Sequence, residues 1–137
     1  MTLFVDSSAW IGLFATADKY YQPASSAFRS LGEQPQRLVT SDYVIDETLT
    51  HILITYGRPN ALRFGHWVLS TPYVDKLRID EDVWQDAWEM FQSYDDKQWA
   101  FTDCTSFVLM RQHHLHRAFT FDHHFEQAGF QLWPGME

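Results

Sequence analysis

Four acidic residues occupy positions where an apolar segment of this 137-residue chain gives way to polar residues. They are Asp6, Glu47, Asp103 and Asp122. Asp6 follows the apolar run at 3–5, and Asp122 follows the run at 118–121. Strand ends and helix starts on one edge of an open α/β sheet form its binding crevice, so we expect the four carboxylates to converge there.

Carboxylates brought together in this way repel one another and take up protons unless a cation lies among them. Magnesium and similar hard cations prefer oxygen ligands, so the four acids predict a site for a divalent metal ion. The alternative is that each acid only caps a helix or lies in its first turn. That alternative is adequate for any one of them, but their joint placement at one end of the predicted sheet favours the metal site.

Two hydroxyl residues, Ser7 and Thr120, lie close in sequence to Asp6 and Asp122. A hydroxyl group beside a metal-binding carboxylate can orient it or donate to a phosphate oxygen. Ser7 as a helix cap and Thr120 as a β-branched strand residue are equally good interpretations. Asp46 is a possible substitute for Glu47, although adjacent helical residues point about 100° apart and only one can face the site.

The elements that must position these residues alternate between strand and helix. We expect strands at 3–5, 38–40, 73–79, 118–121 and 130–132, and helices at 7–14, 23–31, 42–56, 61–71, 80–91 and, starting at Thr102 or Asp103, up to about 114. This order predicts a three-layer α/β/α domain around a central, mostly parallel sheet of four or five short strands. The length fits one domain over 1–137.

Aromatic residues make up 17% of the chain, enough to fill a compact core. One stripe is expected to face that core, namely Val83, Trp84, Ala87, Trp88 and Phe91. Six further aromatics are either core residues or part of a partner surface. They are Trp10, Phe14, Tyr20, Tyr21, Trp67 and Trp99.

The single cysteine, Cys104, allows no internal disulfide, and with no secretory leader expected the chain fits the cytoplasm. No apolar run reaches the roughly 20 residues that span a bilayer. The net charge of -8 argues against a broad nucleic-acid-binding surface, although a cation bound by the acids would offset part of it.

Histidines at 113–124 offer a rival chemistry, because neutral imidazole binds zinc well. Their spacing lacks the arrangement of an established zinc motif, and a helix end followed by a turn accounts for them equally well. Contact of His123 or His124 with RNA stays an open alternative.

Four segments, taken in order, resemble the successive motifs of PIN-domain ribonucleases across almost the whole chain. They are Val5-Asp6-Ser7-Ser8-Ala9-Trp10, the helix bearing Glu47, Phe101-Thr102-Asp103-Cys104, and the segment from Phe119 through Asp122 to Phe125. The chain is most similar to compact VapC-type toxins of toxin-antitoxin modules. This resemblance also favours Glu47 over Asp46.

The resemblance implies an endoribonuclease that uses Mg²⁺ or Mn²⁺ and carries Asp6, Glu47, Asp103 and Asp122 as its catalytic acids. We expect Asp6 and Asp103 to be direct metal ligands, and Glu47 and Asp122 to contact the metal through water or to orient the nucleophile. The expected partners are an RNA substrate such as tRNA or rRNA, a small cognate antitoxin and, as a further possibility, a second copy of the chain. Alternatives are a PIN nuclease of RNA processing and a non-catalytic module with an acidic pocket.

Overall fold

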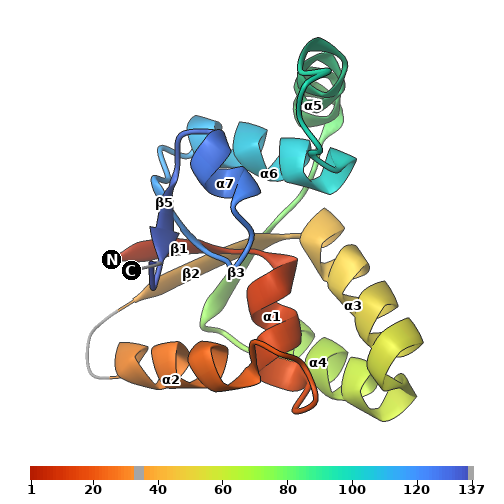
Figure 1. Ribbon diagram of the computed structural model, residues 1–137, viewed down its shortest axis with the longest axis vertical. Coiled ribbons are helices and arrows are strands. Elements are labelled where there is room, and N and C mark those ends of the chain that lie inside the picture. Colours follow the sequence, from red (N-terminus) through yellow and green to blue (C-terminus); the bar gives the residue numbers. More distant parts are fainter. Residues whose placement is uncertain (33–35, 136–137) are drawn as a thin grey trace.

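A central sheet of five parallel strands with helices on both faces forms the framework of the molecule (Figure 1). The computed structural model describes residues 1–32 and 36–135. The strands are β1 (Thr2–Val5), β2 (Arg37–Ser41), β3 (Val74–Leu77), β4 (Arg117–Phe119) and β5 (Gln131–Trp133). The helices are α1 (Ser7–Phe14), α2 (Tyr21–Leu31), α3 (Asp42–Tyr56), α4 (Arg58–Ser70), α5 (Glu81–Ser93), α6 (Phe101–Gln112) and α7 (His124–Gln127). The expected fold class is therefore confirmed.

The strand order in the sheet is β3-β2-β1-β4-β5. The chain moves outward from β1 to β2 and β3, then returns to place β4 on the other side of β1. This reversal creates a crevice at the carboxyl ends of β1 and β4, where open α/β sheets bind their ligands. Asp6 lies there, and its backbone N–H donates to the carbonyl oxygen of Phe119 at 3.0 Å.

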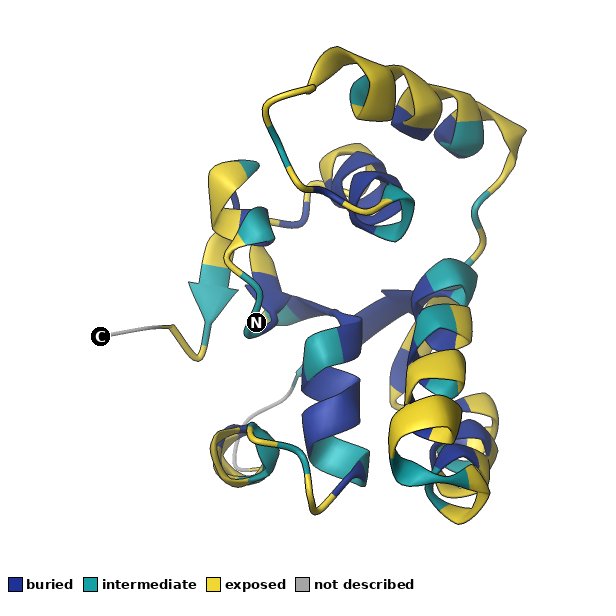
Figure 2. Ribbon diagram, turned by 45° about the vertical axis from the view of Figure 1, so that its right-hand side comes forward, coloured by how far each residue is buried: buried dark blue, intermediate teal, exposed yellow. Residues whose placement is uncertain are grey.

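Helices cover the two faces of the sheet unequally. In Figures 1 and 2, α1, α2 and α4 lie on one side of the sheet, and α6 and α7 lie on the other, with α5 packed outside α6. Buried residues are concentrated in the central strands, in α1 and in α6 (Figure 2). Trp10 of α1 is completely buried, as are Phe4 and Phe119 of the adjacent strands β1 and β4. These large side chains fix the edge of the sheet from which Asp6 projects.

Capping residues set the starts of three helices. Ser41 accepts a hydrogen bond from the N–H of Val44 at 3.1 Å, and Asp80 accepts one from the N–H of Val83 at 2.9 Å. Asp6 is the cap of α1. Helix α6 begins at Phe101, earlier than the expected start, because Asp103 in its first turn accepts the N–H of Ala100 at 3.0 Å.

The stripe on α5 was expected to be core, and this expectation is wrong for two of its residues. Val83 and Ala87 are buried, whereas Trp88 is 42% exposed and Phe91 is 43% exposed. Helix α5 is an outer helix that packs on α6, so only one narrow face of it is covered. Among the described residues, no helix combines the length and apolar character needed to cross a membrane.

Candidate active site

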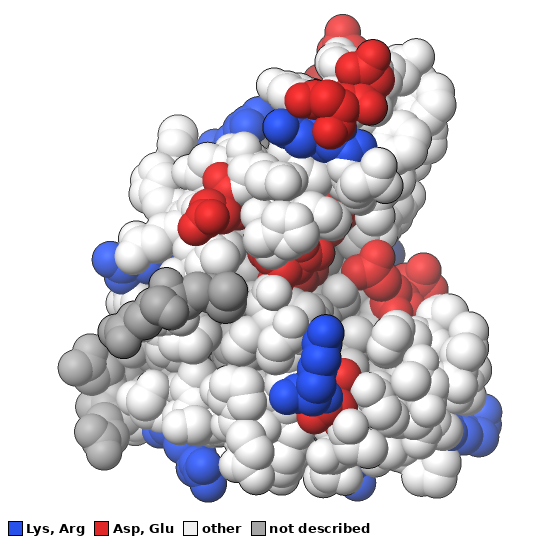
Figure 3. Space-filling view, viewed as in Figure 1, with Lys and Arg blue, Asp and Glu red and all other residues white. Residues whose placement is uncertain are grey.

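Each of the four acids comes from a different segment at the carboxyl edge of the sheet. Asp6 directly follows β1, Glu47 lies in the second turn of α3, and Asp103 lies in the first turn of α6. Asp122 lies in the loop between β4 and α7. Because β4 ends at Phe119, the expectation that Asp122 directly follows a strand is wrong: the strand ends two positions earlier than expected. Figure 3 shows acidic side chains near the middle of this face, between the part formed by α5 to α7 and the part formed by α1 to α4.

Two hydrogen-bonded groups link the four acids in pairs. The Ser7 hydroxyl donates to Oε1 of Glu47 at 2.6 Å and lies 3.4 Å from Oδ1 of Asp6. On the other side, Nδ1 of His124 lies 3.1 Å from Oδ2 of Asp103 and 3.2 Å from Oδ1 of Asp122. The charges of Asp103 and Glu47 both act on Asp6, which joins the two pairs, so the structure brings together all four acids that the sequence singled out.

Hydroxyl groups hold the Asp6 carboxylate. The Thr120 hydroxyl donates to Oδ2 of Asp6 at 2.9 Å and accepts the N–H of Asp122 at 3.0 Å. The Ser8 hydroxyl lies 3.1 Å from the same oxygen of Asp6 and accepts the N–H of Phe121 at 2.9 Å. Thr120 and Ser8 thus tie the end of β4 to the start of α1, which fixes both Asp6 and Asp122.

Two of the acids are buried, and burial disfavours the ionised form of a carboxyl group. Asp6 is only 3% exposed, and this burial, followed by the charges of Asp103 and Glu47, raises the pKa of Asp6 to about 7. Asp103 is 6% exposed, and burial is again the main cause that raises its pKa to about 7. The charges of Asp122 and Glu47 add to this rise in the Asp103 pKa, whereas the hydrogen bond from Ala100 opposes it.

This donor set fits a divalent cation. It offers oxygen atoms from four carboxylates, and two of those carboxyl groups require either a proton or a positive charge nearby at neutral pH. The neighbouring Asp46 is exposed, whereas Glu47 is half-buried and bonded to Ser7, so Glu47 is the member of that pair that faces the site.

The five histidines of 113–124 do not form one cluster. His113, His114 and His116 line a cavity with Thr2, Arg37 and Arg117, at the amino-terminal ends of β1, β2 and β4. His123 and His124 lie at the opposite edge, where a ligand atom from each and one from Asp122 lie within 4.8 Å of one another. Strand β4 separates the two histidine groups. They therefore cannot supply ligands to the same zinc ion.

Two site features were missed by sequence reasoning: the hydrogen bond between Ser8 and Asp6, and the contact between His124 and Asp103. The only sequence signal for the role of Ser8 is its position directly after Ser7. The contact between His124 and Asp103 spans 21 positions and carries no local signature. Trp10 and Trp99, which were possible partner residues, are buried in the core.

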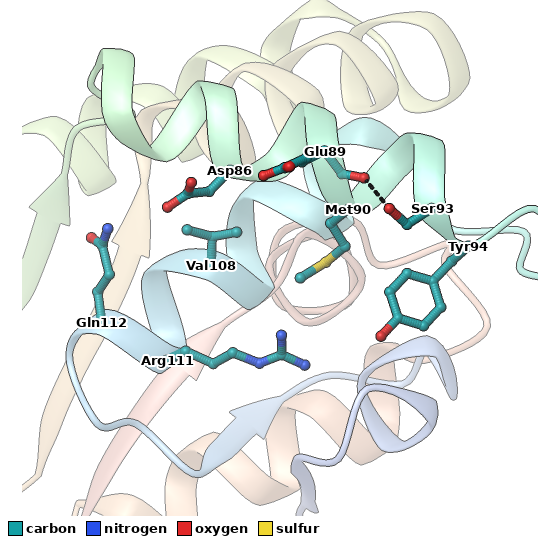
Figure 4. A pocket seen from close by; sticks show the side chains of 8 residues that line it. All are labelled: Asp86, Glu89, Met90, Ser93, Tyr94, Val108, Arg111 and Gln112. Atoms are coloured by element: carbon teal, nitrogen blue, oxygen red, sulfur yellow. Dashed lines mark hydrogen bonds between the residues drawn. The ribbon is translucent and has the colours of Figure 1, made fainter.

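A cavity also lies away from the acids, between α5 and α6. It has a volume of about 670 Å³ and is lined by residues such as Asp86, Glu89 and Arg111. In Figure 4 the Arg111 side chain extends from α6 below the acidic residues of α5. None of the four acids lines this cavity.

Comparison with known proteins decides the family. The model of the PIN domain family matches residues 3–131. The chain belongs to the PIN domain family. The match confirms the family that the four segments suggested, and nucleases of this family generally depend on divalent metal ions.

The curated relatives of this PIN domain belong to the VapC type. The chain is 32% identical over 128 residues to the 23S rRNA-specific endonuclease VapC20 of Mycobacterium tuberculosis, covering 93% of this chain and 95% of that protein. The crystal structure of VapC20, described as a Sarcin-Ricin loop cleaving toxin, has a TM-score of 0.87 at 29% identity, covering 93% of this chain and 95% of that one. This PIN domain is therefore a VapC-type endonuclease, and the expected enzyme class is confirmed.

More distant solved structures share the fold. FitAcB from Neisseria gonorrhoeae has a TM-score of 0.67 at 16% identity, covering 96% of each chain. VapBC2 from Rickettsia felis has a TM-score of 0.66 at 10% identity, covering 96% of this chain and 97% of that one. At these identities the likeness concerns the arrangement of strands and helices.

Proposed function

We propose that this chain is a divalent-metal-dependent endoribonuclease that hydrolyses a phosphodiester bond of ribosomal RNA and acts as the toxin of a toxin-antitoxin module. The observation that carries the proposal is the convergence of four carboxylates, two of them buried with a pKa of about 7. The RNA class follows from the similarity to VapC20, a 23S rRNA-specific endonuclease. We further propose that residues 1–137 act as one PIN domain.

Asp6 and Asp103 are the proposed direct ligands of Mg²⁺ or Mn²⁺, because they are the two acids that most need a positive charge. Glu47 and Asp122 are proposed to bind metal-coordinated waters. When bound, the cation activates water and neutralises charge that develops on the phosphate.

The remaining roles belong to side chains that hold the acids in place. Ser7 keeps Glu47 directed at the crevice and lies 3.4 Å from Oδ1 of Asp6, and Thr120 and Ser8 fix Oδ2 of Asp6. His124 bridges Asp103 and Asp122 and sets the distance between them. With the acids fixed, little reorganisation is needed when the substrate phosphate arrives.

The proposed partner in the cell is a small antitoxin that blocks the acidic crevice. Basic antitoxin side chains would be attracted to a site with four carboxylates in a chain of net charge -8. Association of two copies of the chain remains a prediction.

The test is incubation of the purified protein with ribosomes and total RNA in Mn²⁺, in Mg²⁺ or in chelator, followed by mapping of new RNA ends. We expect a small set of ends in the large-subunit rRNA that requires metal and disappears in Asp6→Asn and Asp103→Asn. Asp46→Asn is the matched control, because Asp46 is exposed beside Glu47 and should retain activity.

The result also separates the alternatives. Folded protein that produces no metal-dependent ends would leave the non-catalytic binding module as the better interpretation. Cleavage without growth arrest on expression, and without rescue by a neighbouring small gene product, would favour a nuclease of RNA processing over a toxin.

A further inference from the structure

Two imidazole nitrogens lie beside the acids on one side of the candidate active site. Nδ1 of His124 lies 3.1 Å from Oδ2 of Asp103 and 3.2 Å from Oδ1 of Asp122. Nδ1 of His123 lies 3.8 Å from the same oxygen of Asp122. We name these four side chains the histidine–carboxylate cluster: Asp103, Asp122, His123 and His124. The cluster offers nitrogen donors and oxygen donors close together.

The spacing of these donors is near that of the corners of a tetrahedral zinc site. Zn²⁺ holds nitrogen and oxygen ligands at about 2.0–2.2 Å, which places neighbouring corners of a tetrahedron about 3.3–3.6 Å apart. The three measured separations, 3.1, 3.2 and 3.8 Å, lie on either side of this range. Small side-chain shifts are therefore enough to complete the coordination of a zinc ion.

No second group of this kind occurs in residues 1–32 and 36–135. Among the His, Cys, Asp and Glu side chains of these residues, only Asp122, His123 and His124 bring three ligand atoms within 4.8 Å of one another. The histidines at the amino-terminal edge of the sheet line a cavity with arginines instead of acids. Their surroundings favour anions, whereas the histidine–carboxylate cluster favours a cation.

The backbone and the packing hold most of the cluster in place. The N–H of His124 donates to Oδ1 of Asp122 at 2.9 Å, which keeps that carboxylate beside the first turn of α7. The side chains of His124 and Asp103 are only 18% and 8% exposed, so their contact is fixed inside the molecule. The side chain of His123 is 71% exposed and is the most accessible member. A cation entering from solvent therefore meets three placed side chains and one that can turn toward it.

The nitrogen donors determine which metal ion the cluster selects. Mg²⁺ takes oxygen ligands, whereas imidazole suits Zn²⁺ and other transition metals. A site with nitrogen and oxygen ligands also binds Zn²⁺ more tightly than Mn²⁺. Asp6 and Glu47, on the other side of the crevice, are held by hydroxyl groups and supply oxygen donors. The two sides of the crevice therefore suit different metal ions.

Zinc at the cluster would compete with the catalytic ion, because both need the same carboxylates. Asp103 is a proposed direct ligand of Mg²⁺ or Mn²⁺, and Asp122 is proposed to bind waters of that ion. Carboxylate oxygens that coordinate Zn²⁺ no longer offer an uncompensated charge to a second cation, which leaves only Asp6 and Glu47 for the catalytic ion. Occupation of the cluster thus withdraws two of the four acids.

We propose that the histidine–carboxylate cluster is a zinc site and that zinc bound there inhibits the nuclease. The inhibition rests on the proposed endoribonuclease function, whereas the binding of zinc does not. In this assignment His123 is a zinc ligand and takes no part in the cleavage of RNA.

The binding test is titration calorimetry of the purified protein with ZnCl₂ and, separately, with MnCl₂. We expect one Zn²⁺ per chain. His123→Asn should weaken zinc binding by at least about tenfold, since even a group that only supports a metal ligand usually contributes that much, and should change Mn²⁺ binding far less. His113→Asn is the matched control, because His113 is an exposed histidine at the opposite edge of the sheet, and it should bind both ions as the wild type does.

A spectroscopic test requires neither a variant nor catalysis. Zn²⁺ is diamagnetic, so nuclear magnetic resonance can follow the ring signals of the seven histidines during a zinc titration. The signals of His123 and His124 should shift together and saturate at one Zn²⁺ per chain, while that of His113 should stay in place.

The inhibition test measures RNA cleavage at a fixed Mn²⁺ concentration while Zn²⁺ is increased. Each protein is compared with its own activity in the absence of zinc. Zinc should inhibit the wild type, added Mn²⁺ should reverse the inhibition, and His123→Asn should require at least about tenfold more zinc for the same inhibition.

The outcomes separate this inference from the proposed function. Equal zinc affinity of the wild type and His123→Asn, with the ring signals of His123 and His124 unmoved, would overturn the zinc site, because carboxylates alone would then bind the ion. Half a zinc ion per chain, with a zinc-dependent dimer in sedimentation, would also overturn it. If zinc binds as expected but cleavage continues, the inhibition is wrong. If the wild type never cleaves RNA, the nuclease proposal fails, and the binding and spectroscopic tests still decide the zinc site.

Discussion

Raising the pH should destabilise this protein when no metal is present. Unfolded Asp6 has a pKa near 3.8, and in the folded chain its pKa is about 7. Between these values the folded state holds a proton that the unfolded state has released, so the free energy of unfolding falls as the pH rises and levels off above about 7. At about 1.4 kcal/mol per pKa unit, the full shift corresponds to about 4 kcal/mol.

The part of this loss that lies between pH 5 and pH 8 is about 3 kcal/mol for Asp6 alone. Asp103 has a pKa raised in the same direction, also to about 7. Its contribution adds only in part, because the charge of Asp103 is itself one cause of the raised pKa of Asp6. A loss of about 3 kcal/mol is a large fraction of the free energy of unfolding of a small domain.

The assay is urea unfolding at pH 5 and at pH 8, in chelator and in saturating Mn²⁺. We expect a loss of stability with pH in chelator and a much smaller loss with metal, because a cation that binds only the folded state offsets the repulsion. Asp6→Asn should be more stable than the wild type at pH 8 in chelator, although it is expected to be inactive. Asp46→Asn serves as the control and should follow the wild type.

A free energy of unfolding in chelator that stays level or increases from pH 5 to pH 8 would refute the reasoning. It would mean that the buried carboxyl groups are stabilised as anions by groups of the protein itself, and the main argument for a metal ion would be lost. The same conclusion would follow if Mn²⁺ raised the stability of Asp6→Asn as much as that of the wild type.

Three further outcomes follow from particular contacts. Ser7→Ala removes the hydroxyl that directs Glu47. RNA cleavage assays should show a roughly 10- to 100-fold loss of activity, which is the usual effect of removing a group that hydrogen-bonds a metal ligand. Thr120→Val leaves the N–H of Asp122 without its acceptor and should lower the free energy of unfolding in urea by about 1–3 kcal/mol. Phe64→Ala creates a cavity in the core and should lower that free energy by about 3–5 kcal/mol without changing the measured affinity for Mn²⁺.

Local patterns were sufficient for much of the fold and for the identity of the acids. The order of strands and helices and the position of Asp6 after a buried strand both depend on near neighbours in sequence. A parallel α/β sheet then brings strand ends to one edge, which is why four acids could be chosen before their positions were known. Helix α7 was not expected, because its four residues are too few to carry a periodic pattern.

By itself, the sequence determined a parallel α/β domain with acids at the ends of its elements. The periodic pattern of apolar side chains and the capping of helices depend on only a few neighbouring residues, so both can be recognised in the sequence. Only the tertiary structure decided which groups surround each acid. It joined Thr120 and Ser8 to Asp6, placed His124 between Asp103 and Asp122, and left Trp88 exposed on an outer helix. These arrangements depend on contacts between distant segments, and burial, which raises the pKa of two of the acids, is a property of the packed chain as a whole.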